Sequence, residues 1–180
     1  SSMRRSWRWC LSCSGLPRND RGCRQPTWVQ RDFGIEVKTF DDLRDGERLP
    51  CRPVVMTREA IIAFATEFDP QPFHVDEKAA GESFFGGLVA SSLHTLSACT
   101  RSVVEAQGNV AILSGVGMDE VRMFNPVRPG DVLTVDARWT ELRRSRSRPH
   151  RGYASIHCKV TNQRGEPVLA YGYRYLVAAR

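Results

Sequence analysis

The sequence predicts an α+β fold in which a curved antiparallel sheet wraps around one long central helix. Two observations carry this prediction. Apolar residues recur every three or four positions up to Gly108 and about every second position after it, so helices come first and strands follow. Only one helical run is long, and a single helix is then the apolar body that can cover the sheet.

Two short helices are expected first, each with a recognisable capping residue. Thr57 precedes REAIIAFATEF, whose apolar residues have helical spacing, and the pair Asp69-Pro70 ends this helix. Asp76 is suited to cap a second helix over Glu77 to Ala80.

The long helix is expected within LVASSLHTLSACTRSVVEAQG, after the turn at Gly86-Gly87 and ending near Gly108. Its predicted apolar stripe consists of Val89, Leu93, Leu96, Thr100 and Val103.

Four long strands and an early one near Val54-Val55 complete the predicted fold. The run GVGMDEVRMF is expected to be a strand with a bulge at Asp119-Glu120, where its alternation slips. PVLAYGYRYLV supplies the last strand, rich in aromatic and β-branched residues. The two middle strands have buried positions at Leu133, Val135, Ala137 and Trp139, and at Ala154, Ile156, Cys158 and Val160. Pro129-Gly130-Asp131 and Asn162 to Gly165 are turn signals.

Residues 1–32 differ from the domain predicted over 33–180. They carry seven arginines against two aspartates, which accounts for five of the six net positive charges. The remainder is nearly neutral and lacks the basic surface that nucleic-acid binding requires, so we expect no nucleic-acid partner. No stretch approaches the roughly 20 apolar residues of a membrane span, so we expect no membrane partner.

The segment 1–32 is interpreted as a poorly ordered basic extension without assigned function. Its arginine- and serine-rich, acid-poor composition also fits an organellar presequence, an upstream start site or a remnant before Met3. Cys10 and Cys13 have the spacing of a zinc half-site, but Cys23 is the only further ligand nearby and a closed site needs four. We therefore expect no metal, and reduced thiols in a cytoplasmic protein.

The stretch FATEFDPQPFHVDEKAAGESFFGGLVASSLHT resembles the MaoC-like dehydratases, which have an Asp, four residues, a His and then a helix-opening segment rich in small residues. Asp69 and His74 match those two positions. The resemblance extends through MFNPVRPGDVLTV and covers about 145 residues, leaving only the N-terminal segment unmatched. It implies a hot-dog fold.

The resemblance also implies an R-specific enoyl-CoA hydratase that adds water reversibly to a trans-2-enoyl thioester. Such a reaction needs a base, a proton for the α-carbon and donors for the thioester oxygen. Asp69 and His74 are the expected catalytic pair, and Pro70 and Pro72 are expected to hold the segment between them in an extended path.

Substrate binding is expected at the start of the long helix, by Ser91, Ser92, Gly87 and Phe85. The family usually has glycine at the position of Ser92, whose amide serves the thioester oxygen. The Cβ of a serine narrows that site, which bears on the acyl chain length that the protein prefers.

Each of these candidate site residues also has an interpretation in which its role is only structural. Asp69 alone reads as a turn residue before proline, and His74 alone as a structural histidine. Ser91 and Ser92 are also suited to close packing. Residues 143–152 are interpreted as a solvated loop, with contact to coenzyme A phosphates as the alternative.

Two other functions compete with the hydratase. Hot-dog folds also host acyl-CoA thioesterases, but these need a carboxylate on the central helix, and none occurs between Leu88 and Val104. The third possibility is a non-catalytic module that binds acyl thioesters. For the hydratase we expect an acyl-CoA or acyl-carrier substrate, a homodimer joined edge to edge through its sheets, and no cofactor beyond the coenzyme A of the substrate.

Overall fold

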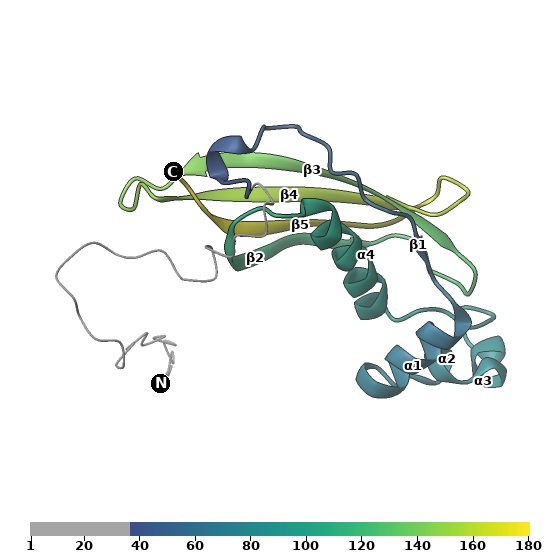
Figure 1. The fold of residues 1–180 in the computed structure, drawn as a ribbon. Coiled ribbons are helices and arrows are strands. Elements are labelled where there is room, and N and C mark those ends of the chain that lie inside the picture. Colours follow the sequence, from purple (N-terminus) through teal and green to yellow (C-terminus); the bar gives the residue numbers. More distant parts are fainter. Residues whose placement is uncertain (1–36) are drawn as a thin grey trace, which may run out of the picture. The chain divides into compact units, whose positions relative to one another are not determined.

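The computed structural model describes residues 37–180, so the expectations for residues 1–32 and for Cys10, Cys13 and Cys23 lie outside the described residues. A five-stranded antiparallel sheet forms the larger part of this region, in the order β1-β3-β4-β5-β2 (Figure 1). The strands are β1 (Val54–Val55), β2 (Ile112–Met123), β3 (Val132–Arg144), β4 (Arg151–Thr161) and β5 (Pro167–Ala178). The predicted α+β fold is confirmed.

The alternation in the two middle strands is confirmed by the burial of every predicted inward residue. Trp139 pairs with Ile156, and Ile156 pairs with the partly buried Tyr173, so one apolar layer runs across β3, β4 and β5. The predicted bulge in β2 is also present, where the register shifts between Asp119 and Arg122. This layer is the wall against which the long helix packs.

Within residues 37–180, four α-helices precede the long strands: α1 (Arg58–Phe68), α2 (Pro72–Val75), α3 (Glu77–Glu82) and α4 (Ser92–Gln107). Both predicted caps are confirmed. The Thr57 side chain accepts a hydrogen bond from Ala60 N–H at 3.2 Å, and Asp76 accepts from Lys78 and Ala79 at 2.8 and 2.9 Å. In Figure 1, α4 lies beside the sheet and α1, α2 and α3 gather beyond one of its ends.

The extended path expected after Asp69 is only partly right, because Gln71 is extended but residues 72–75 form one helical turn. Pro72 occupies its first position, where the missing N–H has no intrahelical acceptor and the fixed φ of proline already suits a helix. His74 therefore projects from a short helix.

The long helix begins later than predicted. Gly86 and Gly87 have φ of 61° and 158°, and residues 88–91 remain non-helical before Ser91 caps α4. The predicted stripe is only partly right: Val103 is buried, but Leu93 is 53% exposed and Val89 precedes the helix. The buried residues of α4 are His94, Thr95, Cys99, Ser102, Val103 and Gln107. The predicted end at Gly108 is confirmed.

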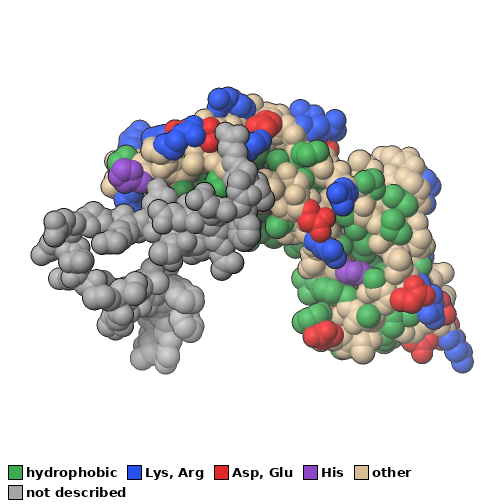
Figure 2. Space-filling view, viewed as in Figure 1, with side chains coloured by type: hydrophobic (Ala, Val, Ile, Leu, Met, Phe, Trp, Pro, Cys, Tyr) green, Lys and Arg blue, Asp and Glu red, His purple; other side chains and the backbone are tan. Residues whose placement is uncertain are grey.

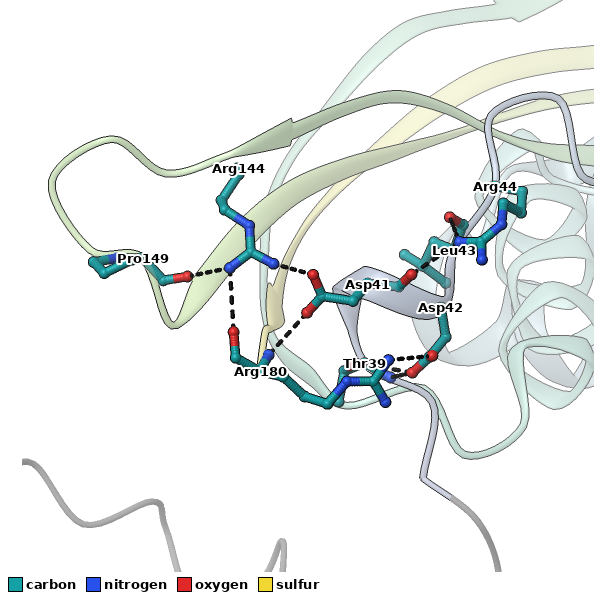
Figure 3. A network of polar contacts seen from close by, with 8 residues as sticks. All are labelled: Thr39, Asp41, Asp42, Leu43, Arg44, Arg144, Pro149 and Arg180. Carbon is teal, nitrogen blue, oxygen red and sulfur yellow. Dashed lines mark hydrogen bonds and ion pairs between the residues drawn. The ribbon is translucent and has the colours of Figure 1, made fainter.

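A polar network joins the short 3-10 helix η2 (Phe40–Asp42) to the ends of β3 and of the chain (Figure 3). The Arg144 guanidinium donates to Asp41 and to the carbonyl of Pro149, and the Arg180 N–H donates to Asp41 at 2.8 Å. Arg180 also pairs with Asp42 at 2.6 Å. Arg144 thus has a structural role at the base of the β3–β4 hairpin, which lies at the opposite end of the sheet from α1, α2 and α3 (Figure 1).

The same network lowers an acidic pKa. The Thr39 N–H and the Arg180 guanidinium both donate to the Asp42 carboxylate, and they hold its pKa at about 2, below the ordinary value of 3.8. Burial has the opposite effect on two thiols of the core, since it raises the pKa of Cys99 and of Cys158 to about 12.

Charged side chains of both signs are mixed along the upper edge of the molecule in Figure 2, over the sheet, and hydrophobic side chains gather over α1, α2 and α3. Phe84, on the segment between α3 and α4, is 98% exposed. Of the helices among residues 37–180, none has the length and apolarity to cross a membrane.

Candidate active site

Asp69 and His74 meet at the junction of α1 and α2. Asp69 is the C-cap of α1, and its N–H donates to the carbonyl of Ala65 at 2.9 Å. The helical turn of α2 then brings the His74 Nε2 to 3.5 Å from the Asp69 Oδ2. A turn between two helices therefore brings together two groups that are five residues apart.

The orientation of the His74 ring is set by a backbone carbonyl. Its Nδ1 lies 2.7 Å from the Val89 carbonyl oxygen, and because a carbonyl only accepts, Nδ1 carries the hydrogen. In the neutral imidazole, Nε2 then presents its lone pair toward Asp69. The His74 residue is 7% exposed, and the Phe73 ring packs against it edge to face at 4.5 Å between centroids.

Asp69 is held from its other side by Ser91. The Ser91 Oγ donates to the Asp69 Oδ2 at 2.6 Å, and the Leu93 N–H donates to the same Ser91 oxygen at 3.2 Å. Ser91 is completely buried. The Asp69 carboxylate is therefore linked through the Ser91 hydroxyl to the first turn of α4.

A cavity of about 440 Å³ opens beside these groups. Its polar lining includes Asp69, His74, Ser92 and Thr95, which all lie on or near the helices. The apolar lining comes from the α2–α4 region, from β2 and β5, and from the connection between β2 and β3: Phe73, Phe84, Phe85, Val89, Met123, Phe124, Val127 and Val168. A polar end beside an apolar wall suits an amphipathic small molecule.

The start of α4 faces this cavity. Ser92 is the first helical residue, a position whose N–H has no intrahelical acceptor, and it lines the cavity. The dipole of a 16-residue helix adds partial positive charge at that end. The cavity therefore places a site for developing negative charge next to a carboxylate and an imidazole.

The sequence-predicted binding residues separate into two groups. Phe85 and Ser92 line the cavity, whereas Gly87 and Ser91 lie outside its lining. Gly87 lies near Arg128, whose Nη1 would be 3.3 Å from a Cβ at that position, and Arg128 donates to the Phe85 carbonyl at 2.7 Å.

Sequence reasoning missed several contributors. The Val89 carbonyl orients His74, Arg128 braces the segment before α4, and Thr95 lines the cavity. Neither the type nor the spacing of these residues in the sequence indicates that they belong to the site. Met123 to Val127 belong to the second stretch that resembles the family, and they form part of the cavity wall.

Two further observations bear on alternative chemistry. Among residues 37–180, no cluster of three or more His, Cys, Asp or Glu side chains has the arrangement of a metal site. His94, on α4, stacks on Phe64 at 4.8 Å between centroids, and burial lowers its pKa from 6.5.

A curved antiparallel sheet packed on one long helix is the hot-dog fold, and in this chain a carboxylate and an imidazole lie just before that helix. Residues 43–159 match the family model of the MaoC like domain, and the chain belongs to that family.

Known relatives agree with this assignment. The crystal structure of the MaoC-like dehydratase from Rhodospirillum rubrum is 40% identical, has a TM-score of 0.73 and covers 79% of this chain and 98% of its own. The Bacillus subtilis protein YdeM is 33% identical over 96 residues, which are 52% of this chain and 67% of YdeM. Protein MaoC of Klebsiella aerogenes is 32% identical over 99 residues, 54% of this chain but only 29% of that protein.

Proposed function

We propose that the protein is an R-specific enoyl-CoA hydratase, which adds water reversibly to a trans-2-enoyl thioester. One observation carries the proposal: the Asp69 carboxylate lies 3.5 Å from the His74 Nε2 at the polar end of a cavity with an apolar wall. The R configuration of the product is what membership of the MaoC-like family implies.

The hydrogen-bond roles of the pair suit the activation of water. With Nδ1 donating to Val89, the neutral His74 offers an acceptor at Nε2, and the Asp69 carboxylate offers only acceptors. A water molecule that donates one O–H to each group has its oxygen lone pairs free for the β-carbon of the enoyl group. The pair takes one proton from this water and returns it to the α-carbon, so no other acid is consumed.

Negative charge that develops on the thioester oxygen is stabilised in this proposal by the N–H of Ser92 at the start of α4. The apolar wall then receives the acyl chain. The Cβ of Ser92, in place of the hydrogen of the usual glycine, lies beside the thioester position, so we expect it to affect which acyl groups are accepted.

A homodimer is the proposed assembly. β2 is an outer strand of the sheet, and it exposes Val116, Met118, Val121 and Met123. A long, exposed, apolar edge strand is a template for pairing with another strand, and a second copy of the chain supplies one.

The alternatives have less support. A thioesterase needs a carboxylate on the central helix at the cavity, but Glu105, the carboxylate of α4, is exposed and pairs with Arg101 at 2.9 Å. A binding module without catalysis does not need two acceptor groups beside one another at the polar end of the cavity.

The test is the loss of the conjugated enoyl-thioester absorbance with crotonyl-CoA and with a longer trans-2-enoyl-CoA. Asp69→Asn and His74→Ala are expected to lower kcat by roughly 100- to 10,000-fold. Glu67→Gln and His157→Gln, which change an exposed carboxylate and an exposed imidazole outside the cavity lining, are the matched controls.

Three results separate the candidates. An R-3-hydroxyacyl product without free thiol supports the hydratase. Release of free thiol supports the thioesterase. Acyl-CoA binding without turnover at any chain length overturns the proposal in favour of the binding module.

A further inference from the structure

Ser91 is completely buried and lies outside the lining of the cavity, although it touches the groups that line it. Its hydroxyl contacts the Asp69 Oδ2 at 2.6 Å and the Leu93 N–H at 3.2 Å. Its carbonyl accepts from the Thr95 N–H at 3.0 Å and from the Thr95 hydroxyl at 3.2 Å. A residue in this position cannot reach the substrate, but it can determine where its neighbours point.

The direction of these hydrogen bonds follows from elementary chemistry. The Leu93 N–H is only a donor, so it uses a lone pair of the Ser91 oxygen, and the hydroxyl hydrogen is left for Asp69. The contact of 2.6 Å is that of a short hydrogen bond from a hydroxyl to a carboxyl oxygen. Ser91 therefore donates to the Asp69 Oδ2, and it does so from a completely buried position.

We propose that Ser91 is a positioning residue for the reaction, an inference that rests on the proposed hydratase function. Its hydroxyl immobilises the Asp69 Oδ2, which also lies on the His74 side, and thereby leaves Oδ1 as the oxygen that exchanges the proton with water. Ser91 is neither nucleophile nor substrate ligand.

The same residue links the two halves of the site. As N-cap of α4, Ser91 determines where the helix begins and hence where the Ser92 N–H lies. Its hydroxyl also holds the carboxylate, so a single side chain sets the distance between the group that activates water and the donor to the thioester oxygen. A small change in this distance has a large effect on the rate, because reacting groups must be held close to their productive positions.

Three substitutions separate this role from helix capping. Ser91→Ala and Ser91→Gly both remove the hydroxyl, but glycine is a tolerable N-cap whereas alanine is a poor one, so their stabilities differ. Both are expected to lower kcat by roughly tenfold to a hundredfold and to leave KM within about twofold. Ser91→Thr retains a hydroxyl and is expected to recover most of the rate.

Thr57→Ala is the matched control. Thr57 caps α1 through an equivalent contact at 3.2 Å but lies outside the cavity lining, so its loss lowers stability without lowering kcat. If kcat of the Ser91 variants follows their thermal stability, as in Thr57→Ala, Ser91 is only a cap and the inference is wrong.

The inference and the proposed function fail in different ways. In one outcome, the wild type hydrates enoyl-CoA, Asp69→Asn does not, and Ser91→Ala and Ser91→Gly have an unchanged rate. This result supports the hydratase but contradicts the proposed role of Ser91. If the wild type hydrates no enoyl-CoA, crystal structures of the wild type and Ser91→Gly still decide the matter. A rotated Asp69 carboxylate in the variant supports positioning, and an unchanged carboxylate contradicts it.

Discussion

Gly152, on β4, lies so close to the Phe40 ring that no side chain fits between them. A Cβ at this position would lie 2.4 to 2.6 Å from three atoms of that ring, about 1 Å inside the usual contact distance. Phe40 cannot retreat freely, because Arg144 lies over its ring at 5.9 Å and also holds the neighbouring Asp41. Gly152→Ala is therefore expected to lower the free energy of unfolding by about 1 to 3 kcal/mol, the usual cost of overpacking.

Urea denaturation and thermal unfolding measure this loss, which corresponds to roughly 2 to 4 °C in Tm for each kcal/mol in a domain of this size. Gly81→Ala is the control, since a Cβ there meets nothing within 4 Å and alanine favours a helix. In a Phe40→Ala background, Gly152→Ala should lower the free energy of unfolding clearly less than it does in the wild type. A loss below about 0.5 kcal/mol with Phe40 present would refute the reasoning.

Other predictions concern acidity, thiol reactivity and assembly. Because the pKa of Asp42 is lower in the folded chain than the ordinary 3.8, its contribution to stability is present above about pH 4 and is lost as the pH falls toward 2. Tm of Asp42→Asn should therefore converge with that of the wild type over this window. Cys99 and Cys158 should resist iodoacetamide at pH 8 and react in urea, as peptide mass spectrometry can show, because burial suppresses their thiolates. Val121→Lys on β2 should convert the proposed dimer to a monomer in light scattering, whereas Val55→Lys on the opposite edge of the sheet should not.

Much of the fold was predictable because burial leaves a local pattern in strands. Trp139 and Ile156 alternate with polar neighbours, and the slip at Asp119-Glu120 marked a real bulge. The start of α4 was less predictable, since Ser91 and Ser92 are both good caps and Val89 has helical spacing without being helical. Spacing also cannot distinguish an apolar residue buried within the chain from an exposed one such as Leu93.

The proximity of Asp69 and His74 was predictable, because their residue types and spacing are local properties. The Val89 carbonyl and the Arg128 brace were not, since a backbone acceptor leaves no residue-type trace and Arg128 meets Phe85 only through tertiary packing. The hydroxyl of Ser91 was expected near the substrate, but its burial and its direction toward Asp69 required coordinates.

The division of the cavity between two parts of the chain has a consequence for evolution and for engineering. The Asp69–His74 pair, the Ser91 hydroxyl and the start of α4 all lie within residues 69–92, whereas the apolar wall is shared between that segment and a second part of the chain, Met123 to Val127 with Val168. The second segment therefore contributes to the wall without carrying either member of the proposed catalytic pair. For the proposed hydratase, exchange of residues 123–127 between relatives should change the preferred acyl chain while Asp69, His74 and Ser91 stay in place, which makes this short segment a natural place to vary specificity.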